Sequence, residues 1–163
     1  MNKIEEILVY LEEFNKKNFM FNVPRETGEL LNFLVNAKRP KKILEIGMSN
    51  GYSTIWLAEP GFPVITIEKD SEKIILAKEN FEKINLNNIS ILMGDALEVL
   101  RRLDERFDFV FIDATKKEYL DYFKLIKFSK GAVVVADNIL SHSKKVKEYV
   151  DYVRKKYHSK LLE

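Results

Sequence analysis

The chain has 163 residues, of which 46% are hydrophobic and 32% are charged, and its formal net charge is +2 at pH 7. This size and balance predict a single soluble domain over residues 1–163, and so small a charge does not by itself indicate a nucleic-acid partner. The absence of cysteine excludes disulfides, thiolate metal sites and a cysteine nucleophile, and without a transmembrane run or a signal peptide we expect a cytoplasmic protein with no membrane partner.

Two helices are expected within residues 1–40, ahead of the sheet. In the first, apolar residues recur at helical spacing between Ile4 and Phe14. The second follows Pro24, a residue that often stands at the start of a helix. Its expected buried residues are Leu30, Leu31 and Leu34.

Residues 41–163 are expected to form an α/β core, because apolar strand-like runs alternate with helical patterns. The predicted strands cover residues 42–46, 63–68, 88–92, 107–112 and 131–136. The predicted helices cover residues 52–58, 71–84, 95–102, 116–127 and 143–157. This order predicts a mostly parallel sheet with helices on both faces, in which ligands bind beyond the carboxyl ends of the strands.

Residues 43–53 form a short apolar run that leads into a glycine loop and then opens a helix. Gly47 and Gly51 let the backbone turn sharply and approach a ligand closely. Ser49 and Tyr52 stand where the dinucleotide fingerprint requires its second and third glycines, so that fingerprint is excluded, and the lysine of a phosphate-binding loop is also missing. The remaining pattern suits a nucleoside without phosphates, such as S-adenosylmethionine, although a turn of this kind can also serve packing alone.

Acidic residues stand at the ends of four of the five predicted strands. Glu68 ends the second strand, where an acid can accept the two hydroxyls of a ribose. If the fourth and fifth strands are neighbours, Asp113 converges with Asp137 and Asn138. Two carboxylates and an amide oxygen suit a hard cation such as Mg²⁺ or Mn²⁺.

Each of these acids also has a simpler interpretation. Asp113 could cap the next helix, and Asp137 with its neighbour could form a turn. Thr115 and Glu118 have the spacing of a capping box, which would leave Asp113 free for another role. Lys116 could face the same site as a general base, or be an ordinary solvated lysine.

The chain resembles the cation-dependent O-methyltransferases, the group that contains catechol O-methyltransferase and caffeoyl-CoA O-methyltransferase. The resemblance covers most of the chain, from about Pro24 to Asn138. It implies a Rossmann-like fold of the class I S-adenosylmethionine-dependent methyltransferases. The motifs that carry it are Leu44-Glu45-Ile46-Gly47, Gly51-Tyr52-Ser53, Ile67-Glu68, Gly94-Asp95-Ala96, Phe111-Ile112-Asp113 with Lys116, and Ala136-Asp137-Asn138.

The resemblance also implies a role for individual residues. Lys116 would be the catalytic base. The metal ligands would be Asp113, Asp137 and Asn138. The residues around S-adenosylmethionine would be Glu45, Gly47, Gly51 and Ser53 at its methionine part, Glu68 at the ribose, Asp95 and Ala96 at the adenine, and Thr27, Gly28 and Asp113 elsewhere around the cofactor site.

The chain departs from its relatives in three places, one of which is a brief front segment that leaves little material for a substrate lid. Ala114 and Thr115 stand where relatives often have bulky residues near the adenine. Relatives also continue into an antiparallel strand pair, which the pattern after residue 143 does not show. We therefore expect the fifth strand to be an exposed edge, which a homodimer partner could cover.

The leading prediction is a metal-dependent O-methyltransferase that acts on a small catechol-like or other vicinal-oxygen acceptor. One alternative keeps the cofactor and takes RNA as the acceptor, with modest support from basic residues at 38–42 and in the last helix. Another is an S-adenosylmethionine-binding module without turnover. His142 and His158 have no visible partners and are expected on the surface.

Overall fold

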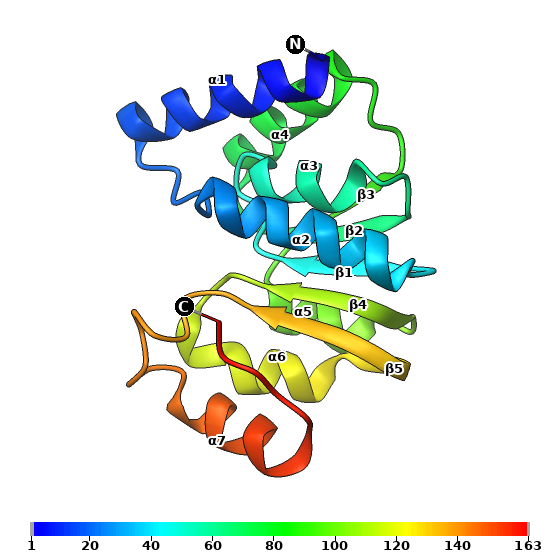
Figure 1. The fold of residues 1–163 in the computed structure, drawn as a ribbon, viewed down its shortest axis with the longest axis vertical. Helices are drawn as coiled ribbons and strands as arrows, with labels where there is room; N and C mark the ends of the chain where they lie inside the picture. The colour runs from blue at the N-terminus through cyan, green and yellow to red at the C-terminus, as the bar shows by residue number, and fades with distance from the viewer. Residues whose placement is uncertain (1, 163) are drawn as a thin grey trace.

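The structure is a computed structural model that describes residues 2–162. Figure 1 shows a layered α/β arrangement with the sheet between two groups of helices. In chain order the elements are α1 (Lys3–Asn18), α2 (Arg25–Lys38), β1 (Ile43–Ile46), α3 (Tyr52–Ala58), β2 (Val64–Glu68), α4 (Ser71–Lys83), β3 (Ile89–Met93), α5 (Ala96–Arg102), β4 (Arg106–Ile112), the 3-10 helix η1 (Lys116–Glu118), α6 (Tyr119–Leu125), β5 (Lys127–Ala136) and α7 (Lys147–Lys156).

The sheet has the strand order β3-β2-β1-β4-β5, and every neighbouring pair is parallel. This confirms the predicted fold class. Within residues 2–162, β5 has one neighbour, β4, so its outer edge is free. Because the strands are all parallel, the carboxyl ends of β1, β2, β4 and β5 lie along one rim of the sheet.

Both faces of the sheet are buried under helices. One apolar cluster joins the sheet to α1, α2, α3 and α4, and the other joins it to α5, α6 and α7. β1 lies in the middle, and all four of its residues are inaccessible to solvent. Near-continuous apolar strands are what such two-sided burial requires, which is why β1, β2 and β4 could be predicted from sequence.

The buried face of α2 differs from the prediction. Leu31 is fully buried, as expected, but Leu30 and Leu34 are only half-buried, and Val35 takes the second core position. Leu30 and Leu34 point toward the free edge of the sheet, where the described chain places no further strand over them.

β5 begins at Lys127, earlier than predicted. The prediction missed its first part because a bulge separates that part from the apolar run over 131–136. Phe107 pairs with Phe128 and Phe109 pairs with Val133, so residues 129–132 bulge out opposite one residue of β4. Lys38 of α2 donates a hydrogen bond from Nζ to the bulge carbonyl of Gly131, at 2.8 Å. A bulge at a free edge hinders pairing with another strand.

The helix predicted over 116–127 is split into η1 and α6, and the last helix begins at Lys147 because residues 139–145 form turns. None of the helices within the described residues is long and apolar enough to cross a bilayer.

Candidate functional site

A cavity of about 580 Å³ lies at the rim formed by the carboxyl ends of β1, β2, β4 and β5. Its opposite wall is the connection between α1 and α2, residues 20–24. The sequence-predicted site residues that line it are Gly47, Ser53, Glu68, Asp95, Ala96, Asp113, Lys116, Asp137 and Asn138. Four others do not line it: Thr27, Gly28, Glu45 and Gly51.

The two glycines of the loop are required by close packing. Gly47 has φ 98°, and a Cβ on it would lie 2.1 Å from the carbonyl oxygen of Asp113. Gly51 has φ 88°, and its Cβ would lie 2.6 Å from the ring of Phe81 on α4. Gly47 therefore lets the glycine loop pass beside the end of β4, while Gly51 lets α3 pack against α4.

Glu45 is fully buried beneath the cavity and does not line it. Its carboxylate accepts hydrogen bonds from Ser53 Oγ at 2.6 Å, Thr54 Oγ1 at 2.5 Å and Thr66 Oγ1 at 2.6 Å. Burial raises the pKa of Glu45 to about 7, although these hydrogen bonds act in the opposite direction. Since Ser53 lines the cavity, Glu45 positions a wall residue, and its contact with a cofactor stays a prediction.

Glu68 lies at the end of β2 and faces the glycine loop. One carboxylate oxygen accepts from the backbone N–H of Ser49 at 2.9 Å. The other accepts from the backbone N–H groups of Lys69 at 2.9 Å and Asp70 at 3.0 Å. These bonds hold the acid rigidly at the cavity wall, in the place where ribose hydroxyls are bound in related folds.

Asp95 caps the N-terminus of α5. Its Oδ1 accepts from the backbone N–H groups of Leu97 at 3.0 Å and Glu98 at 3.3 Å. Asp95 is exposed and lines the cavity beside Ala96. The cap accounts for the aspartate, and its place beside an adenine stays a prediction.

The ends of β4 and β5 bring two acids together, because Ile112 pairs with Ala136 directly before them. Lys116 donates a hydrogen bond from Nζ to Oδ1 of Asp113 at 2.6 Å. Burial raises the pKa of Asp113, the adjacent Lys116 lowers it, and the negative charge of Asp137 raises it further. This cluster is largely buried, with 15% of each side chain exposed for Asp113 and Lys116.

The capping box predicted for Thr115 and Glu118 is wrong. Thr115 makes no side-chain cap hydrogen bond, and the Glu118 carboxylate accepts from the hydroxyl of Tyr122 instead. Asp113 does not cap the helix either, because its carboxylate binds Lys116. The simpler interpretation of Asp113 as a helix cap is therefore excluded.

Within residues 2–162 there is no group of three or more His, Cys, Asp and Glu side chains that could hold a metal ion. A cation here would rest on the carboxylates of Asp113 and Asp137 together with the amide oxygen of Asn138. The donor set fits a hard divalent cation, which prefers oxygen ligands. The fit is supported by the repulsion that Asp137 exerts on Asp113, because a bound cation would relieve it.

Two parts of the cavity wall were missed by the sequence analysis. His142 was expected on the surface but is half-buried and lines the cavity, and its backbone N–H donates to the carbonyl of Asn138 at 3.1 Å. The connection over residues 20–24 also lines it, held by a hydrogen bond from Ser49 Oγ to the carbonyl of Met20 at 3.0 Å. Neither part is marked by a sequence motif, because only the folding of the turns around it brings it to the cavity.

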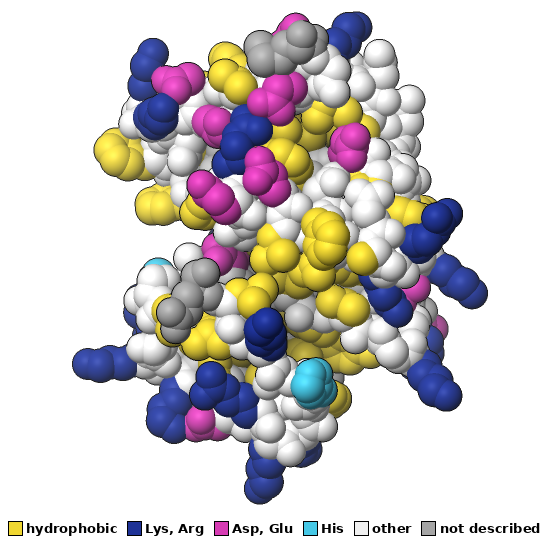
Figure 2. All heavy atoms as spheres, viewed as in Figure 1, with side chains coloured by type: hydrophobic (Ala, Val, Ile, Leu, Met, Phe, Trp, Pro, Cys, Tyr) yellow, Lys and Arg dark blue, Asp and Glu magenta, His cyan; other side chains and the backbone are white. Residues whose placement is uncertain are grey.

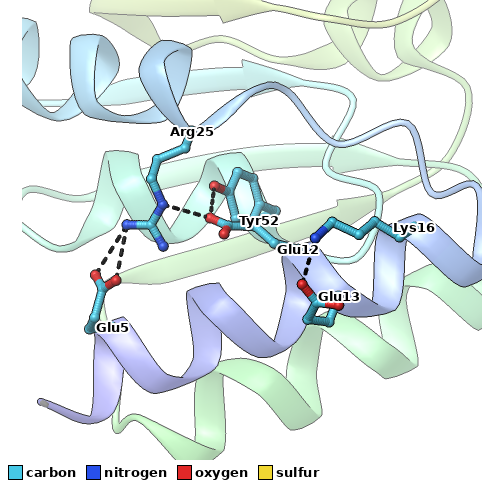
Figure 3. Close-up of polar contacts among 6 residues, drawn as sticks. All are labelled: Glu5, Glu12, Glu13, Lys16, Arg25 and Tyr52. Carbon is cyan, nitrogen blue, oxygen red and sulfur yellow. Dashed lines mark hydrogen bonds and ion pairs between the residues drawn. The ribbon is translucent and has the colours of Figure 1, made fainter.

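Side chains of helix α1 bind residues at the starts of α2 and α3, the two helices that follow these loops (Figure 3). Arg25, at the start of α2, contacts Glu5 and Glu12 of α1, each at 3.0 Å. The hydroxyl of Tyr52, at the start of α3, donates to the same Glu12 at 2.7 Å. The side chain of Glu12 thus joins the helix that follows the connection to the helix that follows the glycine loop.

The all-parallel sheet, with the glycine loop after β1 and an acid at the end of β2, defines a Rossmann-like α/β fold. Residues 2–163 match the model of the O-methyltransferase family. The chain belongs to this family, which confirms the resemblance seen in the sequence.

Among similar proteins, the catechol O-methyltransferase of Niastella koreensis is 35% identical over 138 residues, which are 78% of this chain and 62% of the relative. This chain thus spans less than two thirds of that relative. An O-methyltransferase from Bacillus cereus in complex with SAH (S-adenosylhomocysteine) has a TM-score of 0.82 at 28% identity, covering 93% of this chain and 80% of the other. The O-methyltransferase TomG from Streptomyces achromogenes, in complex with SAM (S-adenosylmethionine), has a TM-score of 0.84 at 27% identity, covering 93% and 78%.

Proposed function

We propose that this protein transfers the methyl group of S-adenosylmethionine to a hydroxyl oxygen of a small catechol-like acceptor, with the help of a divalent cation. The observation that carries the proposal is the convergence of Glu68, Asp113, Lys116, Asp137 and Asn138 on one cavity. The structural neighbours bound to SAM and SAH support the cofactor, and the catechol O-methyltransferase relative supports the acceptor.

The cofactor would lie along the rim of the sheet. Glu68 would accept the ribose hydroxyls, Ser53 and Gly47 would border the methionine part, and Asp95 with Ala96 would border the adenine. When bound, S-adenosylmethionine supplies an electrophilic methyl group on a sulfonium.

Asp113, Asp137 and Asn138 would hold Mg²⁺ or a similar cation at the other end of the cavity. Such a cation supplies Lewis acidity, which lowers the pKa of a bound hydroxyl. Asp113 and Asp137 would neutralise its charge, and half-buried His142 borders the same place.

Lys116 would accept the proton of the acceptor hydroxyl in its neutral form, which a cation held by Asp113 and Asp137 would favour because it replaces the ammonium charge beside them. Its Nζ lies 2.6 Å from Asp113 Oδ1 and 3.0 Å from the hydroxyl of Tyr119, which in turn donates to the carbonyl of Asp137 at 3.1 Å. As the proton passes to the neutral Nζ, the acceptor oxygen would form a bond to the methyl carbon, and the carbon–sulfur bond would break with its electron pair left on sulfur. The chain's contribution is to hold the reacting atoms in line.

The test is transfer of labelled methyl from S-adenosylmethionine to catechol, with Mg²⁺ and then with EDTA, alongside calorimetric titration with S-adenosylhomocysteine. We expect binding, transfer with Mg²⁺, and no transfer with EDTA. Binding without transfer to catechol or RNA would indicate the module without turnover. Transfer to tRNA alone would indicate the RNA alternative, which stays a prediction, as does a homodimer.

A further inference from the structure

The hydroxyl of Tyr119 lies between the proposed base and the end of β5. Tyr119 is the first residue of α6 and is fully buried. Its hydroxyl oxygen is 3.0 Å from Nζ of Lys116 and 3.1 Å from the backbone carbonyl oxygen of Asp137. One hydroxyl group therefore contacts both the proposed base and the backbone of a proposed cation ligand.

The chemistry of these two partners fixes the place of the hydroxyl proton. A carbonyl oxygen can only accept a hydrogen bond, so Tyr119 donates its single proton to Asp137. The lone pairs of the hydroxyl oxygen remain for Lys116, which donates an N–H to them. Tyr119 therefore acts on the lysine as an acceptor.

Lys116 differs from the lysines of the surface in having fixed partners. Figure 2 shows lysine and arginine side chains that project from the surface around α7, where they are free to turn in solvent. Lys116 is largely buried, and its Nζ donates to Asp113 Oδ1 at 2.6 Å as well as to Tyr119. These two are the hydrogen bonds of Nζ within residues 2–162.

Two hydrogen bonds leave one direction open at this nitrogen. Besides its bond to Cε, Nζ has three positions, and in the neutral amine two of them hold N–H groups while the third holds the lone pair. With the N–H groups engaged by Asp113 and Tyr119, the lone pair takes the third position. Lys116 lines the candidate site, so this is the position that an acceptor hydroxyl can reach.

The ring that carries the hydroxyl is held by its neighbours. Tyr149 of α7 packs edge-on against it, with ring centroids 5.8 Å apart and ring planes at 88°. Tyr122, three residues further along α6, packs against it at 6.5 Å. All three rings belong to the apolar cluster that joins the sheet to α5, α6 and α7. Close packing of this kind keeps the hydroxyl in one place.

We propose that Tyr119 is the positioning residue of the base, and that with Asp113 it turns the free position of Lys116 Nζ toward the acceptor. This inference rests on the proposed function. A single hydrogen bond would let the flexible lysine side chain turn about it, whereas two hold it in one orientation. The proton of Tyr119 stays on its own oxygen throughout, and the proton of the acceptor ends on Nζ.

The experiment removes the hydroxyl and keeps the ring. In Tyr119→Phe we expect kcat for methylation of catechol to fall by at least about tenfold, since misplacing a reacting group by about 1 Å can cost about 100-fold. The KM for catechol, the Kd for S-adenosylhomocysteine by calorimetry and the Kd for Mn²⁺ by electron paramagnetic resonance should each change by less than about threefold. The calorimetric stoichiometry counts the folded sites, so a loss of folded protein is not mistaken for a loss of kcat.

The matched control is Tyr149→Phe, which removes a hydroxyl from the ring beside Tyr119 and leaves both hydrogen bonds of Lys116 in place. Its kcat should stay within about twofold of wild type. Wild-type kcat in Tyr119→Phe, when Lys116→Met is inactive, overturns the inference while the proposed function stands. A loss of kcat together with weaker Mn²⁺ binding also overturns it, because Tyr119 would then act through Asp137. If Lys116→Met keeps full activity, or if the wild-type protein methylates no catechol, the proposed base or acceptor fails and the inference falls with it.

Discussion

The ammonium group of Lys116 lies 2.6 Å from Asp113 Oδ1, so the proposed base is paired with a proposed cation ligand. The two residues are three apart and both are largely buried. Lys116 places a positive charge beside Asp113, whose carboxylate is repelled by that of Asp137. A cation bound at these acids would take over that role.

Replacing the proposed base should abolish turnover with little effect on cofactor binding. Lys116→Met is expected to lower kcat by at least about 100-fold, the contribution typical of a positioned general base. The Kd for S-adenosylhomocysteine, measured by calorimetry, should change by less than about threefold. Lys117→Met is the matched control, since its side chain is exposed at the neighbouring position. Equal activity in the two variants would remove Lys116 from the mechanism.

Glu68→Gln should weaken cofactor binding. Hydrogen bonds to a charged acceptor contribute about 1.5–3 kcal/mol, so the Kd for S-adenosylhomocysteine should rise by about 10- to 100-fold. The control is Glu72→Gln, an exposed residue in the first turn of α4. Unchanged affinity in Glu68→Gln would show that the acid only holds the backbone of Ser49, Lys69 and Asp70.

The buried carboxyl of Glu45 should make stability depend on pH. Its pKa is about 7 in the folded state, above the usual 4.5, so the folded protein holds this proton more tightly than the unfolded chain. Its contribution is therefore full below about pH 4.5 and is lost as the pH rises through 7. We expect the free energy of unfolding to fall by up to about 3 kcal/mol across this range.

Urea unfolding at several pH values checks this expectation. Glu45→Gln should flatten the decline, leaving the smaller contribution of Asp113, whose pKa is also raised. Glu29→Gln, at an exposed position of α2, should keep the wild-type profile. A wild-type protein whose stability rises between pH 5 and about pH 7 would contradict the assignment.

Substitutions at two glycines with nearly equal φ should distinguish the cost of backbone strain from the cost of steric crowding. Gly61 has φ 89°, and a Cβ added to it would meet no atom within 4 Å, so Gly61→Ala should cost only the left-handed backbone penalty, about 1–2 kcal/mol. Gly51 has φ 88°, and its Cβ would meet Phe81. Gly51→Ala should therefore cost about 1–3 kcal/mol more, measured as the free energy of unfolding. Equal losses would show that α3 and α4 can move apart freely.

The fold class and most of the rim residues followed from local patterns. β1, β2 and β4 are apolar runs because strands buried on both faces must be apolar, and a one-dimensional pattern can show this. The acids Glu68, Asp113 and Asp137 could be assigned to one edge because parallel strands all end on the same side. These inferences needed only the order of strands and helices.

Contacts between distant segments could not be read in this way. Glu45 is part of the strongest motif, yet it lies under the cavity because Ser53, Thr54 and Thr66 surround its carboxylate. The expected capping box failed because Tyr122 competes for Glu118.

The sequence by itself determined the alternation of strands and helices and the acids at the strand ends, because burial on both faces and chain direction leave a local pattern. Only the tertiary structure decided that His142 reaches the cavity, that the 20–24 connection lines it, and that Leu30 and Leu34 face the free edge of the sheet. Each of these depends on the angle at which one element packs on another, and packing angles come from side chains far apart in the chain.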